Sequence, residues 1–195
     1  MKIRKIGFWG HTHEAPHRNT DSLEEKKKTA EMGGGPARRI ALSAVLSALT
    51  VVLSPLYIPL GATKCFPAQH MMNAVAGVLL GPWYAAAMAV VTGTVRNALG
   101  LGTLYAYPGG VPGALVVGLT HRYLKKTDLV ALMEPLGTVA VGATLSALML
   151  APALGHSMTL YFFWAAFAAS SVPGAVLGYV VLKALRRLGL VGTLL

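Results

Sequence analysis

Three polar side chains at helical spacing, Gln69, His70 and Asn73, offer the clearest chemistry in this sequence. His70 and Asn73 are three residues apart, so on a helix they share a face and could bracket a small ligand. Amide and imidazole groups both donate and accept hydrogen bonds, which suits recognition of a small polar molecule. A structural interpretation is equally open, because the same side chains could cap the helix or bond to neighbouring segments.

Five further residues are candidates for the same binding site. Phe66 lies just before Gln69, and the other four follow later in the chain. Arg96 and Asn97 end an apolar segment, where Arg96 could either bind a ligand or extend its charge to lipid headgroups. Tyr105 and Tyr107 could form a stacking wall for a flat ring or belong to an interfacial aromatic belt. We predict that these residues line the same site as Gln69, His70 and Asn73.

Catalysis and metal binding are less well supported. Cys65 and His70 could in principle form a thiol–imidazole pair, but the sequence supplies no evident orienting third group or oxyanion donor. His11, His13 and His17 have spacing that could bind a metal, yet they lie in a charged N-terminal stretch without apolar periodicity. We therefore predict no catalytic residue, no metal site and no cofactor.

The segments that must position these residues are strongly apolar. The chain has 195 residues, 54% of them hydrophobic, and a mean hydropathy of +0.58. A soluble protein of this composition would lack polar surface, whereas lipid accepts apolar side chains outward and requires backbone groups to bond within helices. The sequence predicts an all-α membrane protein. Between Arg39 and Lys183 the only charged residues are Lys64, Arg96, Arg122, Lys125, Lys126, Asp128 and Glu134.

Proline, glycine and charge clusters divide this region into six predicted transmembrane helices. The segment at 67–80 would rise about 21 Å, less than a hydrocarbon core of about 30 Å, and so would leave a recess beneath the outer loops. The predicted helices lie near 39–54, 67–80, 82–97, 108–124, 132–150 and 159–185.

The positive-inside rule predicts the orientation and the cellular membrane. With the N-terminus inside, Lys64 and Arg96 are the outer basic residues of the membrane domain, so both termini should be cytoplasmic in a multi-pass inner-membrane protein. The domain prediction is a cytoplasmic tail at 1–37, a membrane domain at 38–187 and a short cytoplasmic tail at 188–195, with residues 1–31 dispensable. The inner basic residues are Arg38, Arg39, Arg122, Lys125, Lys126, Lys183, Arg186 and Arg187.

Composition also limits the partners and the ligand. No Walker A motif is present, so ATP hydrolysis would require separate subunits. The basic residues cluster at helix ends, which favours a membrane signal over nucleic-acid binding. Asp128 and Glu134 are both assigned to the inner side, which leaves the outer site without a carboxylate. A neutral or weakly anionic ligand would suit such a site, and a cation would not.

The stretch Lys64–Asn73 (KCFPAQHMMN), followed by AGVLLGPWYA at Ala76–Ala85, resembles the ThiW family. That resemblance implies the substrate-binding (S) component of an energy-coupling factor (ECF) transporter. Its substrate would be the thiamine precursor hydroxyethylthiazole, a small neutral heteroaromatic alcohol. Its partners would be a transmembrane coupling subunit and two ATPase subunits, and the loop Tyr57–Phe66 would gate the site. The alternatives are another precursor such as the thiamine pyrimidine, a stand-alone carrier, or an intramembrane enzyme using Cys65 and His70.

Small residues on the first predicted helix form a candidate partner interface. Ala44 and Ala48, with Ala41 on the same face, match the Ala-x3-Ala pattern by which related subunits dock on the coupling subunit. Small residues at this spacing also occur where membrane helices pack within one chain. The resemblance favours docking on a partner over internal packing.

Overall fold

The computed structural model describes residues 35–61 and 63–191. The N-terminal tail prediction, apart from residues 35–37, and the histidine cluster therefore lie outside the described residues. The described part of the chain begins at the start of the first helix, so the domain division stays a prediction.

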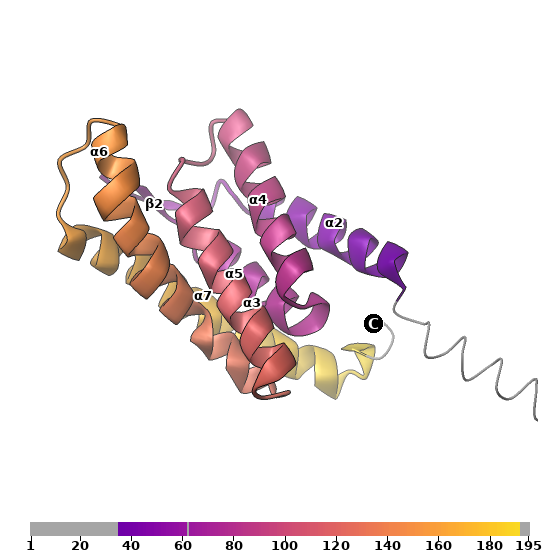
Figure 1. The fold of residues 1–195 in the computed structure, drawn as a ribbon. Helices are drawn as coiled ribbons and strands as arrows, with labels where there is room; N and C mark the ends of the chain where they lie inside the picture. Colours follow the sequence, from indigo (N-terminus) through magenta and orange to yellow (C-terminus); the bar gives the residue numbers. More distant parts are fainter. Residues whose placement is uncertain (1–34, 62, 192–195) are drawn as a thin grey trace, which may run out of the picture. The chain divides into compact units, whose positions relative to one another are not determined.

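Six helical segments and one β-hairpin make up the described fold (Figure 1). Each helical segment overlaps one of the predicted apolar segments. The hairpin lies between the first two helices, and its strands pair antiparallel with Ile58 opposite Cys65. The elements in chain order are α2 (Pro36–Val52), β1 (Ile58–Leu60), β2 (Thr63–Cys65), α3 (Pro67–Leu80), α4 (Pro82–Ala98), α5 (Ala106–Tyr123), a composite helix over residues 128–153, and α7 (Leu160–Arg187).

Two of these helices are long and apolar enough to cross a membrane. They are the composite helix, with 26 residues, and α7, with 28. The helix α3 has 14 residues and rises about 21 Å, as expected from its sequence. The prediction of a helical membrane-type fold agrees with this architecture, whereas six crossings and cytoplasmic termini stay predictions.

Proline and glycine fix where α3 and α4 begin. Pro67 and Pro82 stand at the first positions of α3 and α4, where a missing backbone N–H costs no helical hydrogen bond. Gly81 alone links the two helices and has φ +86°, a backbone conformation that other residues rarely adopt. These residues make the connection tight and set the start of α3, which carries Gln69 and His70.

The helix α3 lies at the centre of the bundle. All its residues from 72 to 80 are buried, and it packs against α7, α5 and α4. Gly174 of α7 closely approaches the first turn of α3, because a Cβ there would lie 2.5 Å from the carbonyl oxygen of Pro67 and 2.6 Å from the Cβ of His70. The first turn of α3 is thus held firmly against α7.

The composite helix departs from regular α geometry along most of its length. It begins with a 3-10 turn, η1 (Asp128–Met133), and continues through two π-helical runs, η2 (Leu136–Ala143) and η3 (Ser146–Leu150), to α6 (Ala151–Ala153). Gly137 and Gly142 of η2 face the backbone carbonyls of Pro112 and Pro108 in α5. Glycine allows this close helix contact, because a side chain would meet the neighbouring backbone.

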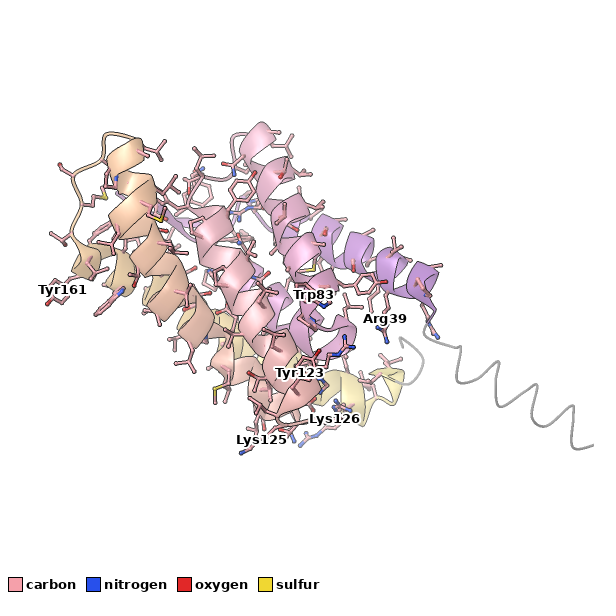
Figure 2. All side chains as sticks on the ribbon, viewed as in Figure 1. Arg39, Trp83, Tyr123, Lys125, Lys126 and Tyr161 are labelled. Carbon is pink, nitrogen blue, oxygen red and sulfur yellow. The ribbon has the colours of Figure 1, made fainter. Side chains whose placement is uncertain are left out.

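The two ends of the bundle differ in chemistry. One end carries the hairpin, the loop 99–105 and the loop 154–159, and it lies at the top of Figure 1. The other end carries basic residues, among them Lys125 and Lys126 (Figure 2). There Arg186 of α7 donates to both carboxylate oxygens of Asp128 at 2.6 Å, which ties the end of α7 to η1.

Candidate functional site

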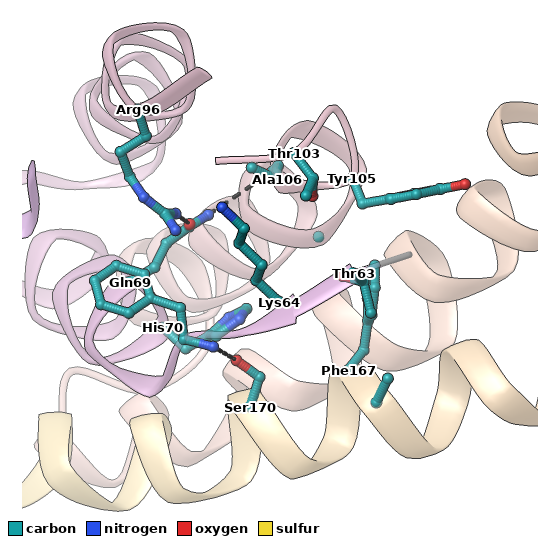
Figure 3. Close-up of a pocket in the computed structure, with 13 residues that line it drawn as sticks. Thr63, Lys64, Gln69, His70, Arg96, Thr103, Tyr105, Ala106, Phe167 and Ser170 are labelled. Carbon is teal, nitrogen blue, oxygen red and sulfur yellow. Dashed lines mark hydrogen bonds between the residues drawn. The ribbon is translucent and has the colours of Figure 1, made fainter. Parts of the chain in front are cut away.

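A cavity of about 400 Å³, including space open to the outside, lies at the hairpin end of the bundle (Figure 3). In this conformation the space left free between its walls holds little more than a water molecule, so a ring-sized ligand requires the walls to move apart. It is enclosed by β2, the start of α3, the end of α4, the start of α5 and the middle of α7. Its lining residues are Thr63, Lys64, Phe66, Gln69, His70, Arg96, Thr103, Tyr105, Ala106, Gly109, Ala166, Phe167 and Ser170.

Five of the eight residues proposed as ligand contacts from the sequence line this cavity. They come from four different segments, so the fold joins residues that are far apart along the chain. The convergence agrees with a single polar site, although their contact with a ligand stays a prediction. The five are Phe66, Gln69, His70, Arg96 and Tyr105.

The other three candidates are not among the lining residues. Asn73 is fully buried and its amide donates to the backbone carbonyl of Gly110 at 3.1 Å. The Asn97 amide donates to two backbone carbonyls, at 2.9 and 3.1 Å. The Tyr107 hydroxyl bonds to that of Thr94 at 3.1 Å. Asn73 and Tyr107 thus join α5 to neighbouring helices, and Asn97 ties α4 to the loop before α5, while their contact with a ligand stays a prediction.

Gln69 and Arg96 form the polar wall between α3 and α4. The Gln69 amide donates to the carbonyl of Ala106 at 3.3 Å and accepts a hydrogen bond from Nη1 of Arg96. The guanidinium carbon of Arg96 also lies 4.2 Å from the centre of the Phe66 ring, a cation–π distance. Arg96 is only 2% exposed, so it does not extend its charge to the headgroups.

His70 is paired with a carboxylate that the sequence analysis assigned to the inner side. Its Nδ1 lies 2.8 Å from Oε1 of Glu134, which is fully buried and also within 2.7 Å of the Thr138 hydroxyl. The prediction that Glu134 lies away from the site is therefore wrong. The composite helix begins at Asp128, and its 3-10 turn rises about 2 Å per residue, which carries Glu134 about 12 Å into the bundle.

The Glu134 carboxylate determines how His70 can act. When Glu134 accepts the Nδ1 proton, Nε2 is the ring nitrogen left to bond to a molecule in the cavity. Gly113 of α5 leaves room for the Glu134 carboxylate, because a Cβ at position 113 would lie 2.8 Å from Cδ of Glu134. The other oxygen, Oε2, is buried and has no hydrogen-bond partner among the described residues. The pair therefore fixes the orientation of His70.

The wall contributed by α7 was not proposed from the sequence. Ala166, Phe167 and Ser170 line the cavity, and the Ser170 hydroxyl accepts a 2.8 Å hydrogen bond from the backbone N–H of Phe66. Ala166 and Ser170 are four residues apart in a series of small residues, a pattern that signals close helix packing but does not by itself indicate a site. Phe167 adds an aromatic side chain to this wall.

Tyr105 connects the cavity to the loop before α7. Its side chain lines the cavity, its hydroxyl bonds to Nδ1 of His156 at 2.7 Å, and its ring packs 5.1 Å from that of Phe163. His156 is exposed in the loop 154–159. Tyr105 thus links the wall of the cavity to the loop 154–159 at the surface.

Cys65 is a buried free cysteine. It is 4% exposed and is not among the residues that line the cavity. Among the described residues, no group of three histidine, cysteine or acidic side chains could hold a metal ion. The site has the features of a binding pocket, with aromatic walls and polar groups fixed in orientation.

Comparison with known proteins adds one match. A family model described as thiamine-precursor transporter protein (ThiW) matches residues 40–188, which include every helix and both strands described here except the first residues of α2. No curated protein and no solved structure gives a significant match.

Proposed function

The chain belongs to the ThiW family of thiamine-precursor transporters, and from this premise we propose that it is the S component of an ECF transporter that captures hydroxyethylthiazole. A member of this family is a membrane protein with transport, not catalysis, as its activity. We further propose that it lies in the inner membrane with both termini in the cytoplasm, because the basic residues cluster at the end opposite the cavity.

The observation that supports this ligand most directly is the composition of the cavity. Phe66, Tyr105 and Phe167 supply aromatic surface suited to a flat ring. Gln69 and His70 add hydrogen-bonding groups that hold fixed orientations. A small heteroaromatic alcohol matches this combination, since its ring can pack between aromatic side chains while its hydroxyl bonds to a polar group.

His70 is the expected partner of the ligand hydroxyl. With Nδ1 occupied by Glu134, Nε2 can accept the hydroxyl proton or donate to its oxygen. A ligand lacking that hydroxyl would leave the nitrogen unpaired in a mostly buried site, which is unfavourable. His70 therefore distinguishes the alcohol from an otherwise similar apolar ring.

We propose that α2 docks on the transmembrane coupling subunit. Ala41, Ala44 and Ala48 are exposed in this structure, so their small side chains are not used for packing within the described chain. Ala44 lines an apolar groove between α2 and α4, whose other walls include Tyr84 and Met88. A small-residue face beside a groove permits close approach of a partner helix. The ATPase subunits would supply the energy, since the sequence has no Walker A motif.

The thiamine pyrimidine is the other ligand that this pocket could accept, because it is also a flat heteroaromatic ring with a short polar substituent. Its exocyclic amine would seek a hydrogen-bond acceptor, whereas the hydroxyl of the thiazole alcohol can both donate and accept. Gln69 Oε1 already accepts from Arg96 and His70 Nδ1 is already bonded to Glu134. His70 Nε2 is therefore the acceptor that these two side chains leave for the amine, and the thiazole hydroxyl would use the same nitrogen.

Uptake of labelled hydroxyethylthiazole by cells that cannot make the thiazole tests the proposal. Cells should accumulate label when they express the chain together with the coupling subunit and both ATPases. Cells expressing the chain with ATPases whose Walker A lysine is replaced should bind label without accumulating it. Accumulation in the absence of the coupling subunits would instead identify a stand-alone carrier.

A further inference from the structure

Within the part of the chain that the structure describes, Arg96 is a buried cation without a carboxylate partner. It is 2% exposed, lines the cavity and makes its one described hydrogen bond to the neutral amide of Gln69. Its Nε is buried and has no partner in the described part of the chain. The Phe66 ring at 4.2 Å gives a further favourable contact but no neutralising charge.

The carboxylates of the described chain are all engaged elsewhere. Residues 35–61 and 63–191 contain only Asp128 and Glu134 as acidic side chains. Asp128 binds Arg186 at the opposite end of the bundle, and Glu134 bonds to His70. Neither contacts Arg96, so within this part of the chain its charge is balanced by no protein anion.

Lys64 brings a second positive charge to the same cavity. Its Nζ donates to the backbone carbonyl of Gly100 at 3.1 Å and lies 4.3 Å from the centre of the Tyr57 ring, both of them neutral partners. Figure 3 shows Lys64 and Arg96 extending toward the same part of the cavity. The two cations come from β2 and α4.

Burying a guanidinium without an anion is unfavourable, because the charge loses its hydration and gains no opposite charge. An anionic oxygen group bound beside the guanidinium would supply the missing opposite charge and offset this unfavourable free energy. Arginine binds phosphate and carboxylate through two parallel N–H donors, and a lysine beside it adds a mobile charge. The unpartnered Nε of Arg96 is one of the donors that such a group would use.

We propose that Arg96 and Lys64 form an anion subsite, and that the pocket takes its small heteroaromatic alcohol preferentially as the phosphate monoester. This inference rests on the proposed function for the ring part of the ligand, whereas the subsite itself rests on the unneutralised charges. The ring would pack against the aromatic walls, and the phosphate, carried on the oxygen assigned above to His70, would extend from there toward Arg96. The pocket would accordingly bind both compounds and prefer the anionic ester to the neutral alcohol.

Calorimetry on the purified, detergent-solubilised chain tests this inference with hydroxyethylthiazole, its phosphate monoester and inorganic phosphate. The ester should bind at least about tenfold more tightly than the alcohol, since an added charge-assisted contact readily contributes that factor. Arg96→Gln should weaken the ester by a larger factor than the alcohol, and so reduce or remove this advantage. Lys64→Gln should reduce it in the same direction. Arg187→Gln, an exposed cation far from the cavity in sequence and position, is the matched control.

Each outcome has a distinct meaning. Equal or tighter binding of the alcohol by the unaltered chain would overturn the subsite and leave the proposed function intact. The same would follow if Arg96→Gln weakened both ligands equally in a chain that elutes as a single folded species. If neither thiazole compound binds, the proposed function fails. Inorganic phosphate then tests the subsite by itself. The subsite stands if phosphate binds and if Arg96→Gln or Lys64→Gln abolishes phosphate binding. It is refuted if phosphate does not bind.

Discussion

The pairing of His70 with Glu134 leads to a quantitative prediction. Their side chains are 2.8 Å apart and buried, and Thr138 adds a second hydrogen bond to the same oxygen. Neutral hydrogen bonds between membrane helices average only about 0.6 kcal/mol, whereas those to charged groups contribute about 1.5–3 kcal/mol. The coupling free energy between His70 and Glu134, measured as described below, therefore reports whether the pair is ionised. We expect about 2 kcal/mol, because an ionised carboxylate has two donors here.

A double-mutant cycle provides the measurement. Glu134→Gln, His70→Asn and the double variant would be unfolded reversibly in detergent, and the coupling is the departure of their free energies of unfolding from additivity. Glu134→Gln keeps an oxygen acceptor, so it should cost less than the 3–5 kcal/mol typical of removing one partner of a buried pair. Ligand affinity should fall in every variant that alters the His70 orientation. Coupling below about 0.5 kcal/mol would refute the argument that Glu134 orients His70 through charge.

Three further predictions concern the interface, the packing and the tail. Ala44→Trp should leave ligand binding intact and block transport, because the indole would fill the groove between α2 and α4. Leu49→Trp, exposed on α2 but outside that groove, is the control, and loss of binding by Ala44→Trp would indicate misfolding instead. Gly174→Ala should cost about 1–3 kcal/mol in unfolding free energy and weaken binding, because its Cβ would lie 2.6 Å from that of His70. Val172→Ala, at an exposed position of the same helix, should change neither the unfolding free energy nor binding. An unchanged unfolding free energy in Gly174→Ala would contradict the close contact. Deletion of residues 1–31 should leave uptake unchanged at equal expression, and lost uptake would make the tail functional.

The helix positions were predictable because their signals are local. Pro67 and Pro82 mark helix starts, Gly81 marks a turn, and apolar runs between charge clusters define the rest. The hairpin was missed because each strand has three residues, too few for an alternating pattern. The site residues Phe66, Gln69, His70, Arg96 and Tyr105 could be grouped from their positions at one end of the predicted helices.

The depth of Glu134 could not be predicted, because it depends on helix geometry that hydrophobic periodicity does not encode. A 3-10 turn followed by π-helical runs changes both the rise and the facing of each residue, and close contact at Gly137 and Gly142 accompanies that geometry. The α7 wall was missed for a related reason. Ser170 and Ala166 look like packing residues in sequence, and only the approach of α7 to α3 brings them to the cavity.

Calorimetric titration of the purified chain decides whether it recognises hydroxyethylthiazole. The chain would be titrated with hydroxyethylthiazole, the thiamine pyrimidine and thiamine, alongside His70→Ala and the exposed control Val172→Ala. We expect one-to-one binding of the thiazole, tighter than that of either other compound. We also expect His70→Ala to weaken binding about 5- to 150-fold, the equivalent of one buried hydrogen bond lost. Failure of the folded chain to bind the thiazole, or tighter binding of the pyrimidine, would contradict the proposed substrate.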